Sequence, residues 1–245
     1  MATSFCVVIP TYNHSHCLDR LATEIGGLKL PLFIVDDGSD EETKKTCQAV
    51  KAKHSHVQLL TLEQNAGKGN ASQRGFELAY EAGFTHAILI DADGQHDVSE
   101  MPQFIEAAKA NPKALVMGNP IFGPEAPQIR VQGRKVTQFW VHLETLKGGL
   151  GDALFGFRCY PLESVTNLSG NFGRGMDFDP EIAVRLYWAG VPIVNLDCKV
   201  SYDTTQPSNF DMVGDNLKMI QLHTKLVIET ILKFPKVAIR RFTKP

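Results

Sequence analysis

The first half of the sequence alternates short apolar runs with segments whose apolar residues recur every three or four positions. The runs are typical of buried strands, and the spaced segments are typical of amphipathic helices. Strands that alternate with helices imply right-handed crossovers, and therefore an α/β fold with a mostly parallel sheet covered by helices on both faces. The strands are predicted at residues 5–10, 32–37, 57–62, 86–91 and 114–119.

Residues suited to ligand binding follow four of these predicted strands, at the point where each strand ends. Ligands of parallel sheets bind beyond the carboxyl ends of the strands, because these ends lie along one edge of the sheet. We therefore expect one site at that edge. Its residues are Pro10, Thr11 and Tyr12 after the first strand, Asp37 after the second, Lys68 after the third, and Asp91 and Asp93 after the fourth.

The composition of the 245-residue chain narrows the class of protein. A formal net charge of −2 gives no reason to expect nucleic acid as a partner, since that binding depends on Lys and Arg neutralising phosphates. The five cysteines form no Cys-x-x-Cys pair, which indicates reduced thiols rather than disulfides or a zinc site. No signal peptide is recognisable, and no stretch approaches the ~18–20 apolar residues that cross a bilayer. We therefore expect a cytoplasmic protein.

The motif DADGQHD after the fourth strand is the most informative. It is not an EF-hand loop, because His96 stands where that loop needs glycine. On an extended segment Asp91 and Asp93 point to the same side, and a turn at Gly94 would bring Gln95 toward them. Oxygen ligands of this kind suit Mg²⁺ or Mn²⁺, so the motif predicts a metal site, with a solvated strand end as the alternative. His96 is interpreted as a neighbour of this site rather than a ligand.

Two further motifs at the predicted edge allow two interpretations each. In VDDGS, Asp37 could accept hydrogen bonds from a nucleoside, or the segment could be a turn that caps the next helix. In NAGKGNA, Gly67 and Gly69 would let backbone N–H groups approach a phosphate at a helix N-terminus. The segment is not a Walker A loop, because the first glycine and the hydroxyl after Lys68 are missing. A surface loop with an exposed lysine is the alternative.

Taken together and in this order, IPTYN, VDDGS, NAGKGNASQRGF and DADGQHD resemble the nucleotide-sugar-binding half of family 2 glycosyltransferases. DADGQHD and the later GDALFGFRCY are similar to the dolichyl- and polyprenyl-phosphate sugar synthases of that family, and the resemblance covers roughly the first 190 residues. It implies the GT-A fold and an enzyme that uses a UDP-, GDP- or dTDP-sugar. It also implies roles for single residues: the backbone of Pro10, Thr11 and Tyr12 with Asp37 would hold the nucleoside, Lys68 would lie near the base or phosphates, and Asp91, Asp93 and Gln95 would hold the metal that bridges the diphosphate.

The second half departs from the family's pattern. Gly118-Asn119-Pro120 stands where relatives commonly carry Gly-Ser-Arg, so an arginine is missing there. Arg130 and Arg134 could bind a phosphate in its place, because a guanidinium matches phosphate oxygens, or they could lie on a solvated face. Arg158 is expected on the acceptor side as well.

Two aspartates are candidates for a catalytic base on the acceptor side. Asp177 and Asp179 lie where inverting members of the family supply an acid, and an alcohol acceptor must lose a proton as it attacks. Asp179 precedes Pro180 and could equally cap a helix. An acceptor that is a lipid phosphate is already ionised and requires no base, so the two aspartates leave the acceptor open.

The chain is expected to divide into a glycosyltransferase domain at 1–205 and a C-terminal extension at 206–245. Within the domain, residues 1–119 would bind the nucleotide-sugar and residues 120–205 the acceptor. The extension would begin with a flexible loop around Ser208 to Asp215, either closing over the donor or simply connecting. It would end in a basic amphipathic helix, suited to an anionic membrane surface or to packing on the domain.

The sequence therefore favours a metal-dependent inverting glycosyltransferase, with a polyprenyl phosphate or another membrane lipid as acceptor and peripheral contact with the inner face of a membrane. A transferase for a soluble or lipid-linked saccharide, with Asp177 or Asp179 as base, is the first alternative. A nucleotide-binding module without catalytic activity is the second, and the intact set of Asp91, Asp93 and Gln95 counts against it.

Overall fold

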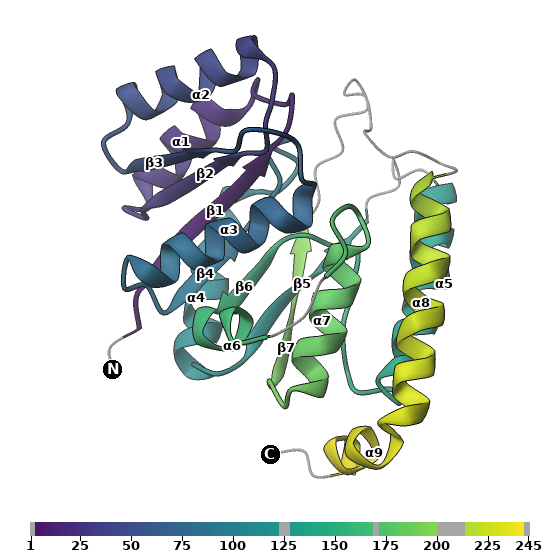
Figure 1. Ribbon diagram of the computed structural model, residues 1–245. Helices are drawn as coiled ribbons and strands as arrows, with labels where there is room; N and C mark the ends of the chain where they lie inside the picture. Colours follow the sequence, from purple (N-terminus) through teal and green to yellow (C-terminus); the bar gives the residue numbers. More distant parts are fainter. Residues whose placement is uncertain (1–2, 123–127, 169–171, 200–213, 243–245) are drawn as a thin grey trace.

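The computed structural model describes residues 3–122, 128–168, 172–199 and 214–242. Its strands form one mixed sheet in the order β3-β2-β1-β4-β6-β5-β7 (Figure 1). The strands are β1 (Phe5–Thr11), β2 (Leu32–Asp36), β3 (Val57–Thr61), β4 (His86–Leu89), β5 (Leu115–Ile121), β6 (Arg158–Pro161) and β7 (Ile193–Lys199). Among the described strands only β6 runs antiparallel to its neighbours, β4 and β5, so the mostly parallel α/β sheet is confirmed.

Helices cover both faces of this sheet, as the alternating pattern predicted (Figure 1). Alternate residues of β1 show the division, because Val7 and Ile9 belong to one buried cluster and Cys6 and Val8 to the other. The first cluster includes side chains of α1, α2 and α4, and the second includes side chains of α3 and α5 to α8. The helices are α1 (Leu18–Gly27), α2 (Glu41–Lys53), α3 (Lys68–Glu81), the 3-10 turn η1 (Val98–Glu100), α4 (Met101–Ala110), α5 (Gln128–Glu144), α6 (Leu162–Thr166), α7 (Phe178–Trp188), α8 (Gly214–Leu232) and α9 (Phe234–Phe242).

Strand β4 is shorter than predicted and ends at Leu89, before either aspartate of DADGQHD. The residues after it form a turn in which Gly94 has a φ of 72°, a backbone conformation that favours glycine. The argument that Asp91 and Asp93 share one side of a regular strand is therefore wrong. A turn, rather than the pleat of a strand, sets where these two side chains lie.

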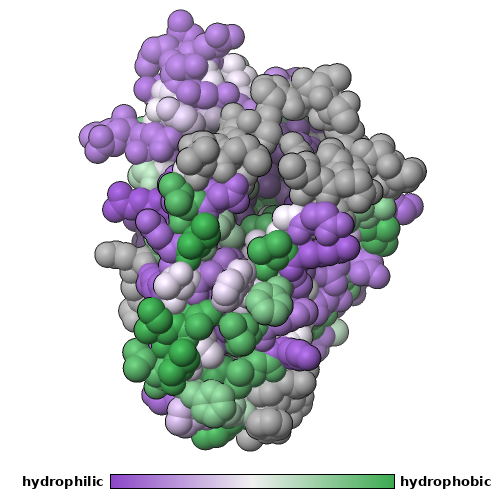
Figure 2. Space-filling model, turned by 90° about the vertical axis from the view of Figure 1, so that its right-hand side faces the viewer, coloured by the Kyte–Doolittle hydropathy of each residue, from purple (hydrophilic) through white to green (hydrophobic). Residues whose placement is uncertain are grey.

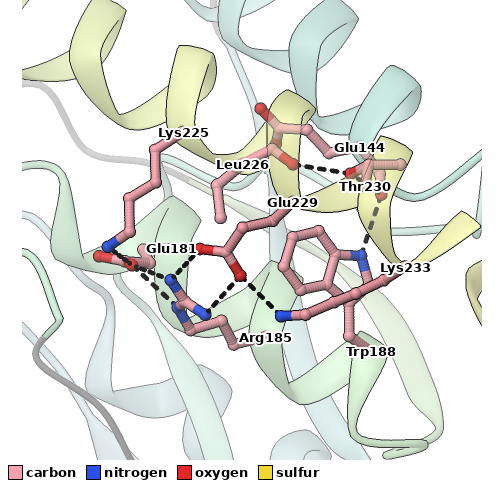
Figure 3. Close-up of polar contacts among 9 residues, drawn as sticks. All are labelled: Glu144, Glu181, Arg185, Trp188, Lys225, Leu226, Glu229, Thr230 and Lys233. Atoms are coloured by element: carbon pink, nitrogen blue, oxygen red, sulfur yellow. Dashed lines mark hydrogen bonds and ion pairs between the residues drawn. The ribbon is translucent and has the colours of Figure 1, made fainter.

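Helix α8 is built into the domain, with Leu222 and Leu226 in the buried cluster that also holds α7. Ion pairs reinforce this packing: Arg185 of α7 lies 3.0 Å from Glu229 of α8, and Lys225 of α8 lies 3.1 Å from Glu181 of α7 (Figure 3). The side chain of Glu181 is only 2% exposed, so its pairing with Arg185 and Lys225 offsets the cost of burying the charge. The packing fixes the direction of α8 relative to the sheet.

Parts of the C-terminal predictions fall outside the described residues. The loop expected over the donor is one of them, because Ser208 and its neighbours up to residue 213 are not described. The last basic residues of the predicted amphipathic helix are likewise outside, namely the side chains of Arg240 and Arg241 and all of Lys244. All five cysteines are free, and Cys6 and Cys198 are buried. None of the described helices combines the length and the apolar character that a membrane span requires.

Candidate functional site

The loops after β1 and β2 are tied together at the carboxyl edge of the sheet. The backbone N–H of Asn13 donates to Ser39 Oγ at 2.9 Å, and the backbone N–H of Asp40 donates to Asn13 Oδ1 at 2.8 Å. Thr11 is buried and its hydroxyl donates to the carbonyl of His14 at 2.6 Å. The two loops therefore form one rigid rim. Of the residues predicted to hold a nucleoside there, Pro10 is buried and Tyr12 is exposed.

Asp37 fastens this rim to the loop after β3. Its carboxylate accepts from the backbone N–H groups of Ala66 and Gly67, at 2.9 Å and 2.8 Å. The backbone N–H of Gly69 donates to the carbonyl of Arg174 at 2.9 Å. These amides already have protein partners, so the prediction that the glycine loop cradles a phosphate is wrong. Gly67 is needed for another reason: its φ is +93°, and a Cβ would lie 2.1 Å from the carbonyl oxygen of Arg174.

Lys68 lies at the centre of the site, between two carboxylates from distant parts of the chain. Its Nζ is 2.7 Å from Asp91 Oδ1 and 2.8 Å from Asp179 Oδ2. Asp91 follows β4 and Asp179 lies in the first turn of α7, so one ammonium group joins the predicted donor half to the predicted acceptor half. The side chain of Asp179 is only 3% exposed, and that of Lys68 only 20%. The alternative of a solvated, exposed lysine is therefore wrong.

Lys68, Asp91 and Asp179 form a charged trio, in which the pKa values of Lys68 and Asp91 are shifted. Burial opposes the ionisation of Asp91, but Lys68, with help from His96 and Arg158, outweighs it and lowers the pKa of Asp91 to about 2. Burial also opposes the charge on Lys68, yet Asp179 and Asp91 raise its pKa above the usual range. Asp91 and Lys68 are therefore both charged near neutral pH, because each is stabilised by the opposite charge beside it.

We expect Lys68→Met to lower the free energy of unfolding by about 2–4 kcal/mol, because two carboxylates lose their shared cation; partial exposure of Lys68 and Asp91 keeps the loss below that of a fully buried pair. Urea unfolding of wild type, Lys68→Met and the exposed control Lys51→Met measures the loss.

Because the pKa of Asp91 is lowered, the contribution of its charge to stability is present above about pH 4 and is lost as the pH falls through about 2. The variant's stability should therefore fall less steeply over that range, and Asp179→Asn should restore part of the loss. Equal stability of Lys68→Met and wild type would contradict the role of the trio.

Helix α1 and the residue at its N-cap hold the turn that carries Asp93 and Gln95. Asp93 Oδ1 accepts from the backbone N–H of Gln95 at 2.9 Å, while Cys17 Sγ and Arg20 contact the carbonyls of Asp93 and Gly94 at 3.4 Å and 3.3 Å. These contacts leave the second carboxylate oxygen of Asp93 without a protein donor from the described residues. The same holds for Oδ2 of Asp91, whose other oxygen binds Lys68.

The donor set fits a hard divalent cation that also takes oxygens from a substrate. Two partly exposed carboxylates and an amide are oxygen ligands of the kind that Mg²⁺ and Mn²⁺ prefer, and these ions usually keep water or phosphate in their other positions. Within the described ranges, no three His, Cys, Asp or Glu side chains converge as a complete metal site. Asp91, Asp93 and Gln95 could therefore hold such an ion together with a diphosphate, but not as a closed protein cage.

Two histidines adjoin the aspartates. His96 is 6% exposed, its Nδ1 accepts from the backbone N–H of Asp91 at 3.2 Å, and its ring packs against Phe155 and Phe157. These contacts agree with the interpretation of His96 as a neighbour. His14 was not anticipated from the sequence: burial and the nearby His16 lower its pKa, while Asp93 and Asp91 pull it upward. The residues HSHC directly after IPTYN were the available signal.

Arg158 has a structural role and not the acceptor-side role that was expected. It is fully buried, and its guanidinium donates to the carbonyls of Ala153, Phe155 and Asp179 at 2.6, 3.0 and 2.6 Å. It cannot reach an acceptor from there; instead it binds the GDALFGFR loop to the first turn of α7. Gly156 of this loop passes over the trio, where a Cβ would lie 2.9 Å from Asp91 Oδ2.

The remaining acceptor-side residues lie around the start of α7 and on α5. Asp177 occupies the N-cap position of α7, so the N-cap interpretation of Asp179 is wrong. Asp177 Oδ1 accepts from the backbone N–H of Gly175 at 2.9 Å. Arg134 is partly buried and pairs with Asp152 at 2.8 Å. Arg130 lies on α5, and its side chain is outside the described residues.

Comparison with known proteins identifies the class to which this fold and site belong. A family model described as glycosyl transferase family 2 matches residues 6–161, and the chain belongs to that family. The resemblance noted in the sequence is thereby confirmed, and the protein is a glycosyltransferase.

Two relatives and one solved structure are similar to this chain. Undecaprenyl-phosphate mannosyltransferase of Micrococcus luteus is 30% identical, over 77% of this chain and 80% of its own. UDP-N-acetylglucosamine–dolichyl-phosphate N-acetylglucosaminyltransferase of Methanococcus voltae is 27% identical, over 66% of this chain and 71% of its own. Glucosyl-3-phosphoglycerate synthase of Mycobacterium tuberculosis, solved with Mn²⁺ and UDP-glucose, matches with a TM-score of 0.68 at 16% identity, over 100% of this chain and 80% of that one. This likeness confirms the GT-A fold.

Proposed function

We propose that the protein transfers a sugar from a nucleotide-diphospho-sugar to a polyprenyl phosphate, with inversion at the anomeric carbon and with Mg²⁺ or Mn²⁺ as cofactor. The donor and the metal are proposed on the residues of the edge, where Asp91, Asp93 and Gln95 offer oxygen ligands beside the rigid rim of the loops after β1 and β2. A bound cation of this kind neutralises the leaving diphosphate and thereby lowers the barrier to its departure.

We infer the class of acceptor from the partners that the two acceptor-side carboxylates already have. Asp179 is buried and paired with Lys68, and Asp177 is engaged with the backbone of Gly175. Asp179 is therefore not free to serve as the general base for a hydroxyl acceptor, and one oxygen of Asp177 is already held by a backbone N–H. A phosphate oxygen is already ionised near neutral pH, so it can attack the anomeric carbon directly while the bond to the nucleoside diphosphate breaks. A single displacement of this kind inverts the configuration.

The relatives point the same way. The Micrococcus luteus and Methanococcus voltae proteins are named for undecaprenyl-phosphate and dolichyl-phosphate, respectively.

A thermal-shift panel of UDP-, GDP- and dTDP-sugars with Mn²⁺ tests the donor part of the proposal, because a ligand that binds only the folded state raises the melting temperature. One of the three should raise it in a Mn²⁺-dependent way. The absence of any such shift for all three, with or without Mn²⁺, would argue against a nucleotide-sugar donor.

We expect Asp177→Asn to keep transfer to a polyprenyl phosphate within about tenfold of wild type, because an ionised acceptor needs no base. A saccharide acceptor that depends on Asp177 as base predicts instead a loss of about 10²–10⁴-fold. Steady-state rates of the two proteins, with the exposed Asp197→Asn as control, distinguish these outcomes. Asp179→Asn is less informative here, since it also removes a partner of Lys68.

A further inference from the structure

Helix α5 exposes an apolar stripe on the side that faces away from the core. Its buried residues Val141 and Glu144 lie on one side of the helix. On a neighbouring side, at positions three, four and seven apart, it exposes large apolar side chains. These are Val136, Phe139, Trp140 and Leu143, with exposed fractions of 60%, 63%, 36% and 45%.

Helix α8 packs beside α5 and exposes a second stripe, which α9 continues. His223 of α8 contacts Glu144 of α5 at 2.7 Å, and Thr230 donates to the carbonyl of Glu144, so the two helices run side by side in the same direction (Figure 1). Figure 2 shows apolar side chains gathered on the lower part of the face that these helices occupy. The stripe consists of Leu217, Ile220, Ile228, Ile231, Leu232, Phe234 and Ile239, each at least 53% exposed. We name the two stripes together the docking face.

The charges of these three helices are arranged for a negatively charged partner. Their acids turn inward and are paired: among the described residues of α5, α8 and α9, no acidic side chain is more than 22% exposed. Their lysines are exposed, and in the described part of the chain Lys135 and Lys236 have no acidic partner. The exposed lysines of the three helices and of the turn between α8 and α9 are Lys135, Lys218, Lys225, Lys233 and Lys236. Of these, Lys218, Lys225 and Lys233 are paired with Asp215, Glu181 and Glu229.

Helix α8 extends to the candidate site. Lys218, one turn into α8, lies beside the loop before α7: its Nζ is 3.8 Å from the position that a Cβ of Gly175 would take. Asp177, which binds the backbone of Gly175, is on the acceptor side of the proposed reaction. The docking face therefore begins next to the place where the acceptor's phosphate would enter.

We propose that the docking face lies against an anionic bilayer, and so presents the site to a lipid-linked acceptor. An apolar stripe bordered by lysines matches the boundary between acyl chains and anionic headgroups. A second copy of the chain fits less well, since a two-fold contact would set these lysines against one another. The sequence placed membrane contact in the basic C-terminal segment, which includes α8 and α9; the structure adds α5 to it. The link to the acceptor rests on the proposed function, whereas contact with the bilayer does not.

Co-sedimentation of the full chain with vesicles tests this surface. Vesicles of phosphatidylcholine with about a third phosphatidylglycerol should bind wild type more tightly than vesicles of phosphatidylcholine alone, and added salt should weaken the binding. The triple variant Phe139→Ser, Ile220→Ser, Ile231→Ser should have an affinity for these vesicles at least about tenfold lower than that of wild type. A matched triple variant with Leu28→Ser, Tyr80→Ser and Ile121→Ser removes exposed apolar side chains elsewhere and should bind as wild type does.

Equal binding by the two triple variants, or no binding by wild type, would overturn the proposal. So would a dimer of wild type in size-exclusion chromatography that the first triple variant abolishes, because the docking face would then be covered by a second copy. Activity with a short, water-soluble prenyl phosphate separates this proposal from the proposed function. The docking-face variant should keep that activity, while the lack of it in wild type would refute the acceptor and leave the vesicle result standing.

Discussion

Replacing Asp93 by asparagine is expected to slow sugar transfer by about 10²–10³-fold while leaving the protein folded. The substitution keeps the hydrogen bond from the backbone N–H of Gln95 but removes the negative charge with which Asp93 would hold a divalent cation. Stabilisation of charge on a leaving group is usually the largest single contribution to such a transfer. Calorimetry should show a matching loss of Mn²⁺-dependent affinity for the nucleoside diphosphate.

Asp97→Asn is the matched control for Asp93→Asn. Asp97 belongs to the same motif and is exposed, and its side chain accepts only from the backbone N–H of Ser99, which asparagine also permits. Its activity should stay close to that of wild type. Unchanged metal-dependent affinity in Asp93→Asn, or an equal loss in Asp97→Asn, would contradict the assignment of Asp93 to the metal.

Arg158→Met should have the largest effect on stability. The substitution removes the guanidinium that donates to three buried carbonyls and separates the GDALFGFR loop from the first turn of α7. Buried charged groups with full hydrogen bonding typically cost about 3–5 kcal/mol when one partner is removed. For a domain of this size that loss lowers the melting temperature by roughly 6–20 °C.

Guanidinium unfolding of Arg158→Met and of Arg74→Met measures the difference. Arg74 lies on α3 with its side chain 50% exposed, and its ion pair with Glu77 is a surface pair, so its loss should cost less than about 1 kcal/mol. Should Arg158→Met unfold within about 1 kcal/mol of wild type, the guanidinium could not be the clamp between loop and helix.

The sequence predicted the α/β sheet and the edge at which the site lies, because both depend on local patterns. Apolar runs and helical spacing determine strands and helices, and the ends of parallel strands share one edge whatever the details of packing. Asp37, Lys68 and Asp91 all lie at that edge as expected. The strand that was expected to end at Asp91 ends at Leu89, because Gly94 and its neighbours form a turn that strand periodicity alone does not show.

The partners of these side chains could not be predicted, because they come from remote segments. Lys68 and Asp179 are 111 residues apart, and no spacing in the sequence relates them. The amides after β3 were expected to bind phosphate but bind Asp37 and the carbonyl of Arg174, since the loop before α7 closes over them. Arg158 was expected at the acceptor for its charge, yet the carbonyls around it bury it completely.

Transfer of a labelled sugar to a polyprenyl phosphate tests the central claim most directly. The purified protein would be incubated with UDP-, GDP- and dTDP-sugars, with a polyprenyl phosphate in anionic vesicles, and with Mn²⁺ or EDTA. We predict that one of the donors gives a glycosyl polyprenyl phosphate whose anomeric configuration is inverted relative to the donor. This product should form with Mn²⁺ and be absent with EDTA. Transfer to a saccharide in parallel reactions, with none to the polyprenyl phosphate from any donor, would contradict the account.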